Sequence, residues 1–595
     1  MRKAFAFAAI LALLIPCVAQ AKPLAWQGWS SDLFEQSKRQ NKLVLLDLEA
    51  VWCHWCHVME ETTYSDPKVQ ELLNEHFITV KVDQDANPDL ANRYGDWGWP
   101  ATILYAPDGT EIAKLRGYRD PEAMASILKA FIAEPTPGPS VVTEEPMVAS
   151  TAMFFSTIQR ALLEQRWKES YDTANGGWGS IQKFMHAGSM DYALNMAEAG
   201  DATAAKQARQ TLDQALKLID RVDGGMFQYS DKEDWSSPHY EKIMTTQAYA
   251  LRTYAYASRR FDDPAYAKAA DDMARYLMTK LQSPDGGFYV SQDADVSSDF
   301  PGKDYYGLDA AGRGKHKAPA IDTHIYARES GLAIAALANY SAFTGNQAAL
   351  DAALRGARWV IANRALPGGG FRHGVDDRAG PYLADTMAMG QAAIDLYSAT
   401  GDRSWLTIAG NAGDFIAAKF TGEFGYVTSA SGETSSGPLS KPAFVVEENI
   451  DAARFFNNLS RYLGKDADRQ RAGHAMRALA SATVVNSPRF LAGALVADQE
   501  LAIEPVHLTL VGHHGDKAAQ DLHAAAAAYP ASYRRLDWWD TREGPLPNPD
   551  VQYPDMGEAA LFACSNQICS QPIFKADQID KVVKAMTALR VTARE

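Results

Sequence analysis

The feature that most constrains this chain is a pair of cysteines at the junction of a predicted strand and a predicted helix. Residues 43–48 are apolar apart from Asp47, and Cys53 and Cys56 follow at the start of a helical segment that runs to about Thr63. Free N–H groups and the macrodipole at a helix N-terminus stabilise a thiolate. We therefore expect Cys53 to be an exposed nucleophile and Cys56 to resolve its mixed disulfides.

The segments around this pair alternate between helix and strand. Asp66 and Pro67 have the residue types of an N-cap and a first helical position, which predicts a helix to about residue 76. Apolar runs predict strands at 78–82, 101–105 and 110–115, and an amphipathic pattern predicts a last helix at 121–131. This order, with an antiparallel hairpin before the last helix, is that of the thioredoxin fold.

Two further residues fit a redox pair in this fold. Asp47 is expected to be buried beneath Cys56, with a raised pKa, and to accept its proton, although local hydrogen bonds to a strand acid are the alternative. Pro100 precedes a strand, where a cis proline would face the disulfide and leave backbone free to pair with substrate. Trp97 and Trp99 either wall that groove or pack in the core.

The same segment also fits two cofactor patterns. Cys-x-x-Cys-His is the attachment motif of c-type haem, and two thiols with His54 and His57 could hold a metal. The buried strand and the later Trp-Pro favour a dithiol instead, so neither cofactor nor metal is predicted. His54, when protonated, is expected to favour the Cys53 thiolate. Trp52 and Trp55 are assigned to substrate binding.

The N-terminus has the pattern of a secretory signal. Met1-Arg2-Lys3 precedes an apolar run at 4–15 and a small-x-small end at Ala21, which predicts a signal peptide over 1–21. Cys17 offers a lipid-modified alternative. We therefore expect a periplasmic or secreted protein that is soluble after cleavage. The net charge of −15 argues against a nucleic-acid partner.

Composition divides the mature chain into four parts. The predicted thioredoxin-like domain covers 22–133, and a Pro-rich linker covers 134–148. Long amphipathic helical patterns, interrupted by recurring glycine–aromatic breaks, cover 149–490 and predict stacked hairpins in an α/α toroid. The remainder, 491–595, reads as a small α/β cap with a predicted strand at 506–511 and helix at 517–528.

Segments on both sides of the linker match one family pattern: Trp52–Glu60, Tyr64, Pro88-Asp89, Gly98-Trp99-Pro100, Pro238–Lys242 and Asp293-Ala294-Asp295. On these residues the chain resembles the thioredoxin-domain-containing family that includes the spermatogenesis-associated thioredoxin-like proteins. The resemblance implies a thioredoxin-like domain fused to a toroid similar to six-hairpin glycosidases and N-acylglucosamine 2-epimerases. One departure, Thr246-Gln247 in place of an Asp-Asn pair, weighs against inherited carbohydrate activity; the loop 84–87 also departs from the family pattern.

The toroid motifs supply polar candidates for a central pocket: His239, Glu241, Lys242, Asp293, Asp295, Asp322, His324 and Asp385. They fit either sugar chemistry, which needs paired carboxylates, or the bracing of loops. Cys564 and Cys569 are expected to form a structural disulfide, with a relay that exchanges with Cys56 as the alternative.

The sequence thus favours an exported thiol–disulfide oxidoreductase, multidomain in architecture, with Cys53 as nucleophile. Its expected partners are protein or small-molecule disulfides and a membrane electron donor or acceptor. The alternative from another class is a carbohydrate-active or carbohydrate-binding toroid with a redox-sensing thioredoxin domain.

Overall fold

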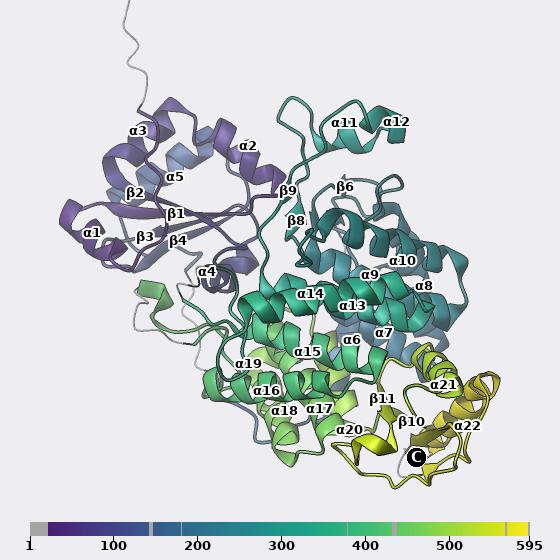
Figure 1. The fold of residues 1–595 in the computed structure, drawn as a ribbon. Coiled ribbons are helices and arrows are strands. Elements are labelled where there is room, and N and C mark those ends of the chain that lie inside the picture. Colours follow the sequence, from purple (N-terminus) through teal and green to yellow (C-terminus); the bar gives the residue numbers. More distant parts are fainter. Residues whose placement is uncertain are drawn as a thin grey trace, which may run out of the picture.

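The computed structural model describes residues 22–141, 147–179, 181–375, 377, 379–430, 437–565 and 568–592. The predicted signal peptide lies outside these ranges, as does part of the predicted linker. Figure 1 shows an N-terminal α/β domain, a large helical region and a small C-terminal α/β region, with the two α/β parts at opposite ends of the molecule. In the described part of the chain, no helix has the length and apolar character needed to cross a membrane.

The N-terminal domain is built on a four-stranded sheet in the order β2-β1-β3-β4. Strand β1 pairs in parallel with β2 and antiparallel with β3, which pairs antiparallel with β4. The strands are β1 (Leu43–Glu49), β2 (Phe77–Asp83), β3 (Ala101–Tyr105) and β4 (Glu111–Arg116), and the helices are α1 (Leu33–Gln40), α2 (His54–Thr62), α3 (Pro67–His76), α4 (Pro88–Tyr94) and α5 (Pro121–Ala133). The predicted thioredoxin fold is confirmed.

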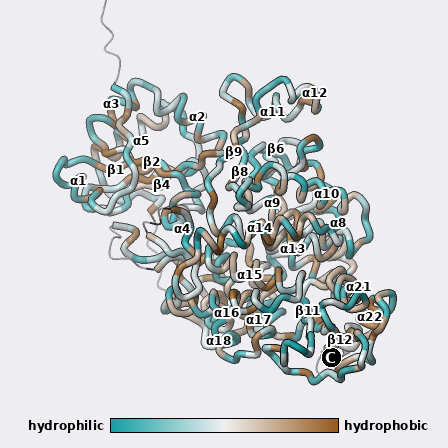
Figure 2. The backbone as a smooth tube through the Cα atoms, in the orientation of Figure 1, coloured by the Kyte–Doolittle hydropathy of each residue, from teal (hydrophilic) through white to brown (hydrophobic). Residues whose placement is uncertain are grey.

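Strand β1 is the centre of this domain because both of its faces are covered. Val44, Leu46 and Leu48 belong to one buried cluster and Leu43 and Leu45 to another. Successive side chains on a strand point to opposite faces, so a central strand with two covered faces needs a continuous apolar run. Figure 2 shows hydrophobic segments gathered in this sheet and in the middle of the helical region.

The helical region is a ring of helical hairpins. Among the described residues the inner helices are α7 (Ala187–Glu198), α9 (Met244–Phe261), α13 (Ala327–Thr344), α15 (Leu383–Thr400), α17 (Val446–Leu463) and α20 (Ala492–Ala502). Their outer partners are α8 (Ala202–Ala215), α10 (Pro264–Tyr276), α14 (Gln347–Arg364), α16 (Ser404–Lys419), α18 (Asp466–Leu479) and α6 (Thr157–Glu169). Helix α20 packs on both α17 and α7, which closes the ring, so the predicted α/α toroid is confirmed.

The glycine–aromatic breaks form the same kind of turn after successive outer helices. The aromatic residue or its equivalent forms an isolated antiparallel bridge with a residue just after the preceding outer helix: Tyr171–Trp178, Ile219–Met226, Gln282–Phe288, Ala365–Phe371 and Thr421–Tyr426. Gly225 shows why glycine is needed, because its φ is +78° and an added Cβ would lie 2.8 Å from the Tyr276 ring. The breaks are therefore structural turns of a repeated unit.

Short elements lie at the end of the toroid that faces the N-terminal domain (Figure 1). They are β5 (Tyr229–Ser230), β6 (Pro238–His239), β7 (Lys242–Ile243), β8 (Ser291–Gln292), β9 (Ile321–Asp322), α11 (Gly302–Tyr306) and α12 (Ala310–Arg313); α19 (Ala482–Val485) precedes α20. Strands β7, β8 and β9 form one small sheet, and β5 and β6 form another. These hairpins hold the toroid motifs that meet the cysteine pair.

The C-terminal region repeats the strand order of the N-terminal sheet. Its strands are β10 (Val506–Val511), β11 (Arg534–Trp539), β12 (Ala560–Ser565) and β13 (Ile568–Cys569), in the order β11-β10-β12-β13. Strand β10 is parallel to β11 and antiparallel to β12, with α21 (Lys517–Ala527) between the parallel strands and α22 (Ile579–Thr592) at the end. The predicted C-terminal α/β segment is confirmed.

Candidate functional site

The cysteine pair spans the first turn of helix α2. Cys53 is the N-cap, its Sγ accepts a hydrogen bond from the Cys56 backbone N–H at 3.2 Å, and the two cysteines form a disulfide. Each cysteine is only 4% exposed, and the pair belongs to a small buried cluster with Ala50 and Trp52, against which Trp99 and the toroid residue Ile243 pack. The prediction of an exposed Cys53 is therefore wrong for this arrangement of the domains.

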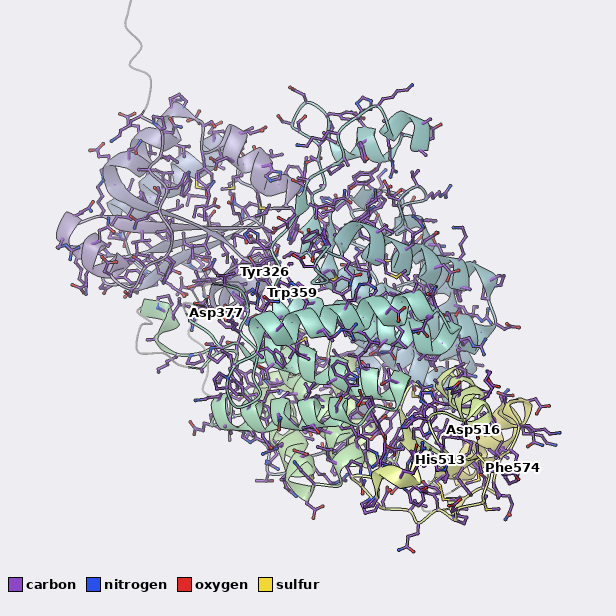
Figure 3. All side chains as sticks on the ribbon, viewed as in Figure 1. Tyr326, Trp359, Asp377, His513, Asp516 and Phe574 are labelled. Carbon is purple, nitrogen blue, oxygen red and sulfur yellow. A yellow bond between two sulfur atoms is a disulfide. The ribbon has the colours of Figure 1, made fainter. Side chains whose placement is uncertain are left out.

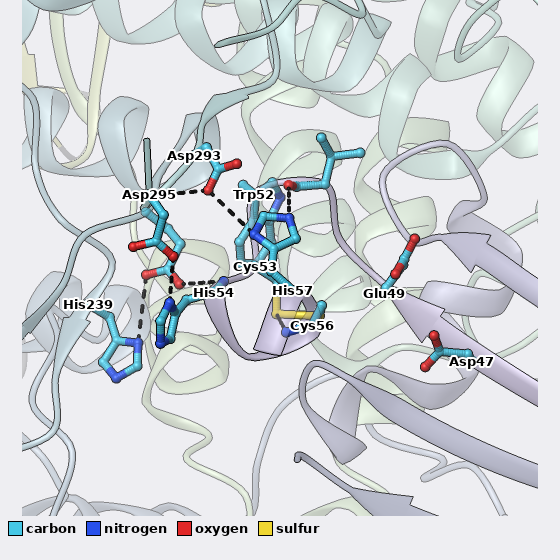
Figure 4. Close-up of a disulfide and its surroundings, with 12 residues drawn as sticks. Asp47, Glu49, Trp52, Cys53, His54, Cys56, His57, His239, Asp293 and Asp295 are labelled. Carbon is cyan, nitrogen blue, oxygen red and sulfur yellow. Dashed lines mark hydrogen bonds and ion pairs between the residues drawn. A yellow bond between two sulfur atoms is a disulfide. The ribbon is translucent and has the colours of Figure 1, made fainter. Parts of the chain in front are cut away.

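Two toroid motifs contact the residue that follows Cys53. The His54 Nδ1 lies 2.5 Å from an Asp295 carboxylate oxygen, and the His54 backbone N–H donates to Glu241 Oε1 at 3.3 Å (Figure 4). Glu241 stands between β6 and β7, and Asp295 follows β8, so neighbouring hairpins bring both carboxylates to α2. The hydrogen bond to Asp295 raises the pKa of His54.

From Glu241, the contacts continue away from the disulfide through a histidine and a further aspartate. The second oxygen of Glu241 lies 3.7 Å from His239 Nδ1, and His239 Nε2 lies 2.5 Å from Asp231. Tyr229 stacks on the His239 ring at 4.2 Å. Burial opposes protonation of His239, yet its bonds to Glu241 and Asp231 raise its pKa. Sequence reasoning missed Asp231; the β5–β6 hairpin, whose strands are too short to detect, brings its carboxylate within hydrogen-bond distance of His239.

A second histidine of the motif faces a third toroid carboxylate. His57 Nε2 lies 3.0 Å from the Val51 carbonyl oxygen and its Nδ1 lies 4.0 Å from Asp293. Burial raises the pKa of Asp293 to about 6. Three potential ligand atoms lie within 4.8 Å of one another, one each from His57, Asp293 and Asp295. A single cation could contact all three. Both Asp295 oxygens already accept hydrogen bonds, from His54 and the Gly302 N–H, so we assign these residues to a hydrogen-bonded network.

Behind the disulfide, Asp47 has the environment predicted for it. Its side chain on β1 is 2% exposed, and burial, with a smaller contribution from Glu49, raises its pKa to about 7. The Tyr64 hydroxyl donates to Asp47 at 3.1 Å, so the local hydrogen bond of the alternative interpretation is present as well. Burial and the raised pKa are confirmed; the proton-transfer role stays a prediction. Pro100 is buried and follows a cis peptide bond.

The four tryptophans assigned to substrate binding or the groove differ in accessibility. Trp52 is buried, and its Nε1 donates to Asp85 at 2.7 Å. Trp97 packs against the core of the sheet, and Trp99 packs partly on the core and partly on the cysteines. Trp55 is 40% exposed beside Tyr118, with 5.6 Å between ring centroids. Only Trp55 among these four thus presents a substantially open ring.

Three inner helices near the junction of the two domains carry the same pair of residue types at their third and fourth positions. The third residue is an acid with one buried oxygen that lacks a hydrogen-bond partner among the described residues: Glu329 in α13, Asp385 in α15 and Glu448 in α17. The fourth residue accepts from the backbone N–H of the adjacent break: Ser330 from Phe288, Thr386 from Phe371 and Asn449 from Tyr426. The toroid therefore has a partial ring of carboxylates at its mouth, above a ring of loop braces.

Helix α9 carries Thr246 and Gln247 at these same positions. Gln247 accepts from the Met226 N–H and donates to its carbonyl, both at 2.7 Å, so it braces the loop as its equivalents do. Thr246 stands where the other three helices carry an acid. The departure from the family pattern noted in the sequence thus removes one member of the carboxylate ring and keeps the brace.

The remaining toroid candidates divide between the junction and structural roles. His373, which sequence reasoning missed, donates to the Asp85 carbonyl at 2.7 Å and lies 2.9 Å from Asp385. Burial opposes its protonation, but Asp385 raises its pKa to about 9. Tyr326 stacks on His373 at 4.0 Å and lies where the two domains meet (Figure 3). His373 thus ties the loop 84–87 to the toroid.

Two further candidates lie elsewhere. Lys242 is fully buried 2.7 Å from Asp220, and burial lowers its pKa to about 8, so it braces a loop. The His324 side chain is two-thirds exposed and bonds Asp322 at 2.6 Å. Neither residue contacts the cysteine motif through an interaction found in the described part of the chain.

The second cysteine pair forms a disulfide in the β12–β13 hairpin. Cys564 and Cys569 are direct cross-strand partners and are bonded to each other. Cys564 is buried beside the Tyr553 hydroxyl. Figure 1 places the C-terminal region, with β10, β11 and α22, at the opposite end of the molecule from helix α2.

Two family descriptions match the chain. Residues 17–129 match a thioredoxin-type family described as a protein of unknown function, DUF255, with the short name Thioredox_DsbH. Residues 195–481 match the catalytic domain of GH127 β-L-arabinofuranosidase. The second match lies within the toroid and includes Glu241, Asp293 and Asp295.

Curated relatives match over part of the chain. Spermatogenesis-associated protein 20 of Homo sapiens is 26% identical over 315 residues, which are 46% of this chain and 39% of that protein. Thiol:disulfide interchange protein DsbD 1 of Pseudomonas aeruginosa is 36% identical over 84 residues, 14% of each chain. The chain therefore spans about two fifths of the length of the longest-matching relatives.

Among solved structures, a sugar epimerase from a ruminal bacterium is 12% identical and covers 58% of this chain and 98% of that chain, with a TM-score of 0.45. The chain thus joins a DUF255-type thioredoxin-like domain to a toroid similar to the GH127 catalytic domain, and its resemblance to spermatogenesis-associated protein 20, inferred from the motifs, is confirmed.

Proposed function

We propose that the protein is an exported thiol–disulfide oxidoreductase, periplasmic or secreted, that uses Cys53 and Cys56. The observation that supports this most is the disulfide across the first turn of α2, with Cys53 at the N-cap and the buried strand β1 leading into it. This position gives a thiolate the stabilisation that exchange requires. The likeness to a thiol:disulfide interchange protein over 84 residues agrees with this proposal.

The proposed reaction transfers two electrons from the dithiol to a substrate disulfide. The Cys53 thiolate attacks one substrate sulfur, forms a mixed disulfide and releases the other sulfur as a thiolate. Cys56 gives its proton to the Asp47 carboxylate, attacks Cys53 and releases the second substrate thiolate. A pKa of about 7 suits Asp47 to accept and return a proton near neutrality. A dithiol donor of another protein, such as a membrane reductase, would regenerate the cysteines.

The toroid would control access to this chemistry. With each cysteine 4% exposed, a folded protein substrate can reach Cys53 only after the thioredoxin-like domain moves away from the toroid. A small disulfide such as glutathione disulfide needs a smaller opening, so we expect it to react faster than insulin with the full chain.

Reduction of insulin disulfides by the full chain, with dithiothreitol as donor, tests the proposal. We expect Cys53→Ser to reduce turnover to the uncatalysed rate, and the paired variant Cys564→Ser with Cys569→Ser to retain it. Equal turnover in wild type and Cys53→Ser would refute the redox function.

The partial ring of carboxylates supports a second candidate function, a carbohydrate-active toroid with a redox-sensing thioredoxin domain. Glu329, Asp385 and Glu448 direct partnerless oxygens from three helix starts, and glycoside hydrolysis uses such paired carboxylates. The test is hydrolysis of an aryl β-L-arabinofuranoside. Under this candidate Glu329→Gln and Asp385→Asn lose activity and Cys53→Ser keeps it; no hydrolysis by wild type in either redox state would remove the candidate.

A further inference from the structure

Two groups accept hydrogen bonds from different backbone N–H groups in the first turn of helix α2. A thiolate at an N-cap is stabilised by the free N–H groups of the first helical turn. Here the Cys56 N–H points at Cys53 Sγ at 3.2 Å, but the His54 N–H donates to the Glu241 carboxylate at 3.3 Å. The toroid thus supplies an anion to the helix end at which the Cys53 thiolate would form.

Glu241 is held in this position from both sides. It is 3% exposed, and it lies between the His54 backbone N–H at 3.3 Å and the His239 imidazole at 3.7 Å. Helix N-termini favour bound anions, so α2 itself stabilises the Glu241 carboxylate. An uncharged disulfide tolerates this neighbour, whereas a thiolate one residue away is repelled by it.

We propose that Glu241, although it belongs to the toroid, is a positioning residue for the redox pair: it occupies the N-terminus of α2 and opposes ionisation of the Cys53 thiol. This inference rests on the proposed thiol–disulfide function and adds a regulator to the same site. While the domains are in contact, the oxidised pair is favoured. Movement of the thioredoxin-like domain away from the toroid removes the carboxylate and activates Cys53.

The other charged groups at the junction are less suited to this role. Asp295 is paired directly with His54 at 2.5 Å, and Asp293 lies 4.0 Å from His57, so each faces an imidazole. On the far side, Asp47 and Glu49 project from β1. Only Glu241, among the carboxylates described around the motif, accepts a hydrogen bond from a backbone N–H of the first turn of α2.

The ionisation of Cys53 in the reduced full chain tests the proposal. Its pKa is obtained from the pH dependence of alkylation by iodoacetamide, followed by mass spectrometry on the peptide that contains Cys53. We expect Glu241→Gln to increase the thiolate fraction about tenfold at a pH below the Cys53 pKa. At a pH above both pKa values, where Cys53 is ionised in both proteins, the same tenfold ratio makes the reduction potential about 30 mV less negative.

A matched control and a conservative variant sharpen the result. Glu233→Gln changes an exposed glutamate of the neighbouring β5–β6 turn, and we expect a wild-type alkylation profile. Glu241→Asp keeps the charge but withdraws it by one methylene, so the profile should shift in the same direction and by less; this variant also decides the matter if Glu241→Gln does not fold. An unchanged profile, or a shift toward less thiolate, overturns the proposal.

The measurement separates this inference from the proposed function because alkylation needs no turnover. If Glu241→Gln shifts the profile while no variant reduces any disulfide, the inference stands and the oxidoreductase function fails. If Cys53 is required for insulin reduction and Glu241→Gln leaves its ionisation unchanged, the function stands and the inference fails.

Discussion

The two α/β parts of this molecule share a strand order but place their cysteines differently. In the N-terminal sheet, the helix after the first strand begins with Cys53 at its N-cap. In the C-terminal sheet, the corresponding helix α21 begins with Asp516, whose side chain accepts from the Ala518 N–H, and the cysteines lie on a hairpin. Figure 3 shows Asp516 at the end of the molecule remote from the junction of the domains. The strand order alone therefore does not identify a candidate redox pair. The residue at the helix N-terminus distinguishes the two sheets.

The two sheets also differ in the pKa of a buried aspartate that each contains. Asp47 accepts a hydrogen bond from the neutral Tyr64 hydroxyl, and burial raises its pKa to about 7. Burial acts on Asp537 too, but Arg535 at 2.6 Å and His507 at 3.0 Å hold its pKa at about 2. One aspartate is thus suited to exchange protons near neutrality, and the other is a permanent structural charge.

The largest expected effect on stability is the loss of that structural charge. Asp537→Asn leaves Arg535 buried and without its main partner, which we expect to cost about 3–5 kcal/mol in the C-terminal region at pH 7. Hydrogen exchange of β10 and β12 peptides in increasing denaturant measures it. Asp550→Asn is the control, because Asp550 also contacts Arg535 but is half-exposed, and should cost less than about 1 kcal/mol. Equal costs would contradict the contrast.

Asp47 should make the N-terminal domain less stable as the pH rises. The Asp47 carboxyl binds a proton more tightly in the folded protein than in the unfolded chain. Its contribution to the free energy of unfolding is therefore present in acid and is lost as the pH rises toward and through the folded pKa of about 7. Between pH 5 and 8.5 the loss should be about 3 kcal/mol, and Asp47→Asn should abolish it. Unfolding in urea at both pH values measures the difference. Parallel pH profiles for wild type and variant would show that Asp47 is ionised throughout.

Removal of the hairpin disulfide should affect stability without affecting redox turnover. The variant Cys564→Ala with Cys569→Ala frees a short loop, and chain entropy predicts a cost of about 2 kcal/mol. Insulin reduction should change by less than about twofold, within the scatter expected for a site remote from the chemistry. A tenfold fall in turnover would instead support the relay between the two cysteine pairs.

The smallest expected effect concerns the helix end that lacks a cysteine. Asp516→Ala removes the side-chain cap of α21 and should destabilise the C-terminal region by about 1 kcal/mol. Thermal unfolding measures it, with Asp516→Asn as a control that retains the capping oxygen. No difference between alanine and asparagine would mean that the cap contributes nothing here.

Local signals in the sequence predicted much of the fold. Apolar runs located β1 and β10 correctly, and Asp66 with Pro67 located the start of α3. These features depend on neighbours in the chain, so residue order alone records them. The same holds for the position of Cys53 before α2 and for the burial of Asp47.

What the sequence could not predict depends on how the domains meet. The contacts of His54 with Glu241 and Asp295 join residues 187 and 241 positions apart, and no periodicity encodes them. The error about the exposure of Cys53 is of the same kind, since the toroid residue Ile243 packs against the buried cluster that contains the cysteines. Asp231 was missed because the hairpin that brings it to His239 has strands of only two residues, and His373 because its partner Asp85 lies in the other domain.

The most direct test of the central claim is to trap the exchange intermediate in the full chain. A Cys56→Ser variant cannot resolve a mixed disulfide, so a substrate sulfur should remain bonded to Cys53, and peptide mapping after incubation with glutathione disulfide should find it there. Glutathione on Cys564 or Cys569 alone, or on no cysteine, would contradict the account.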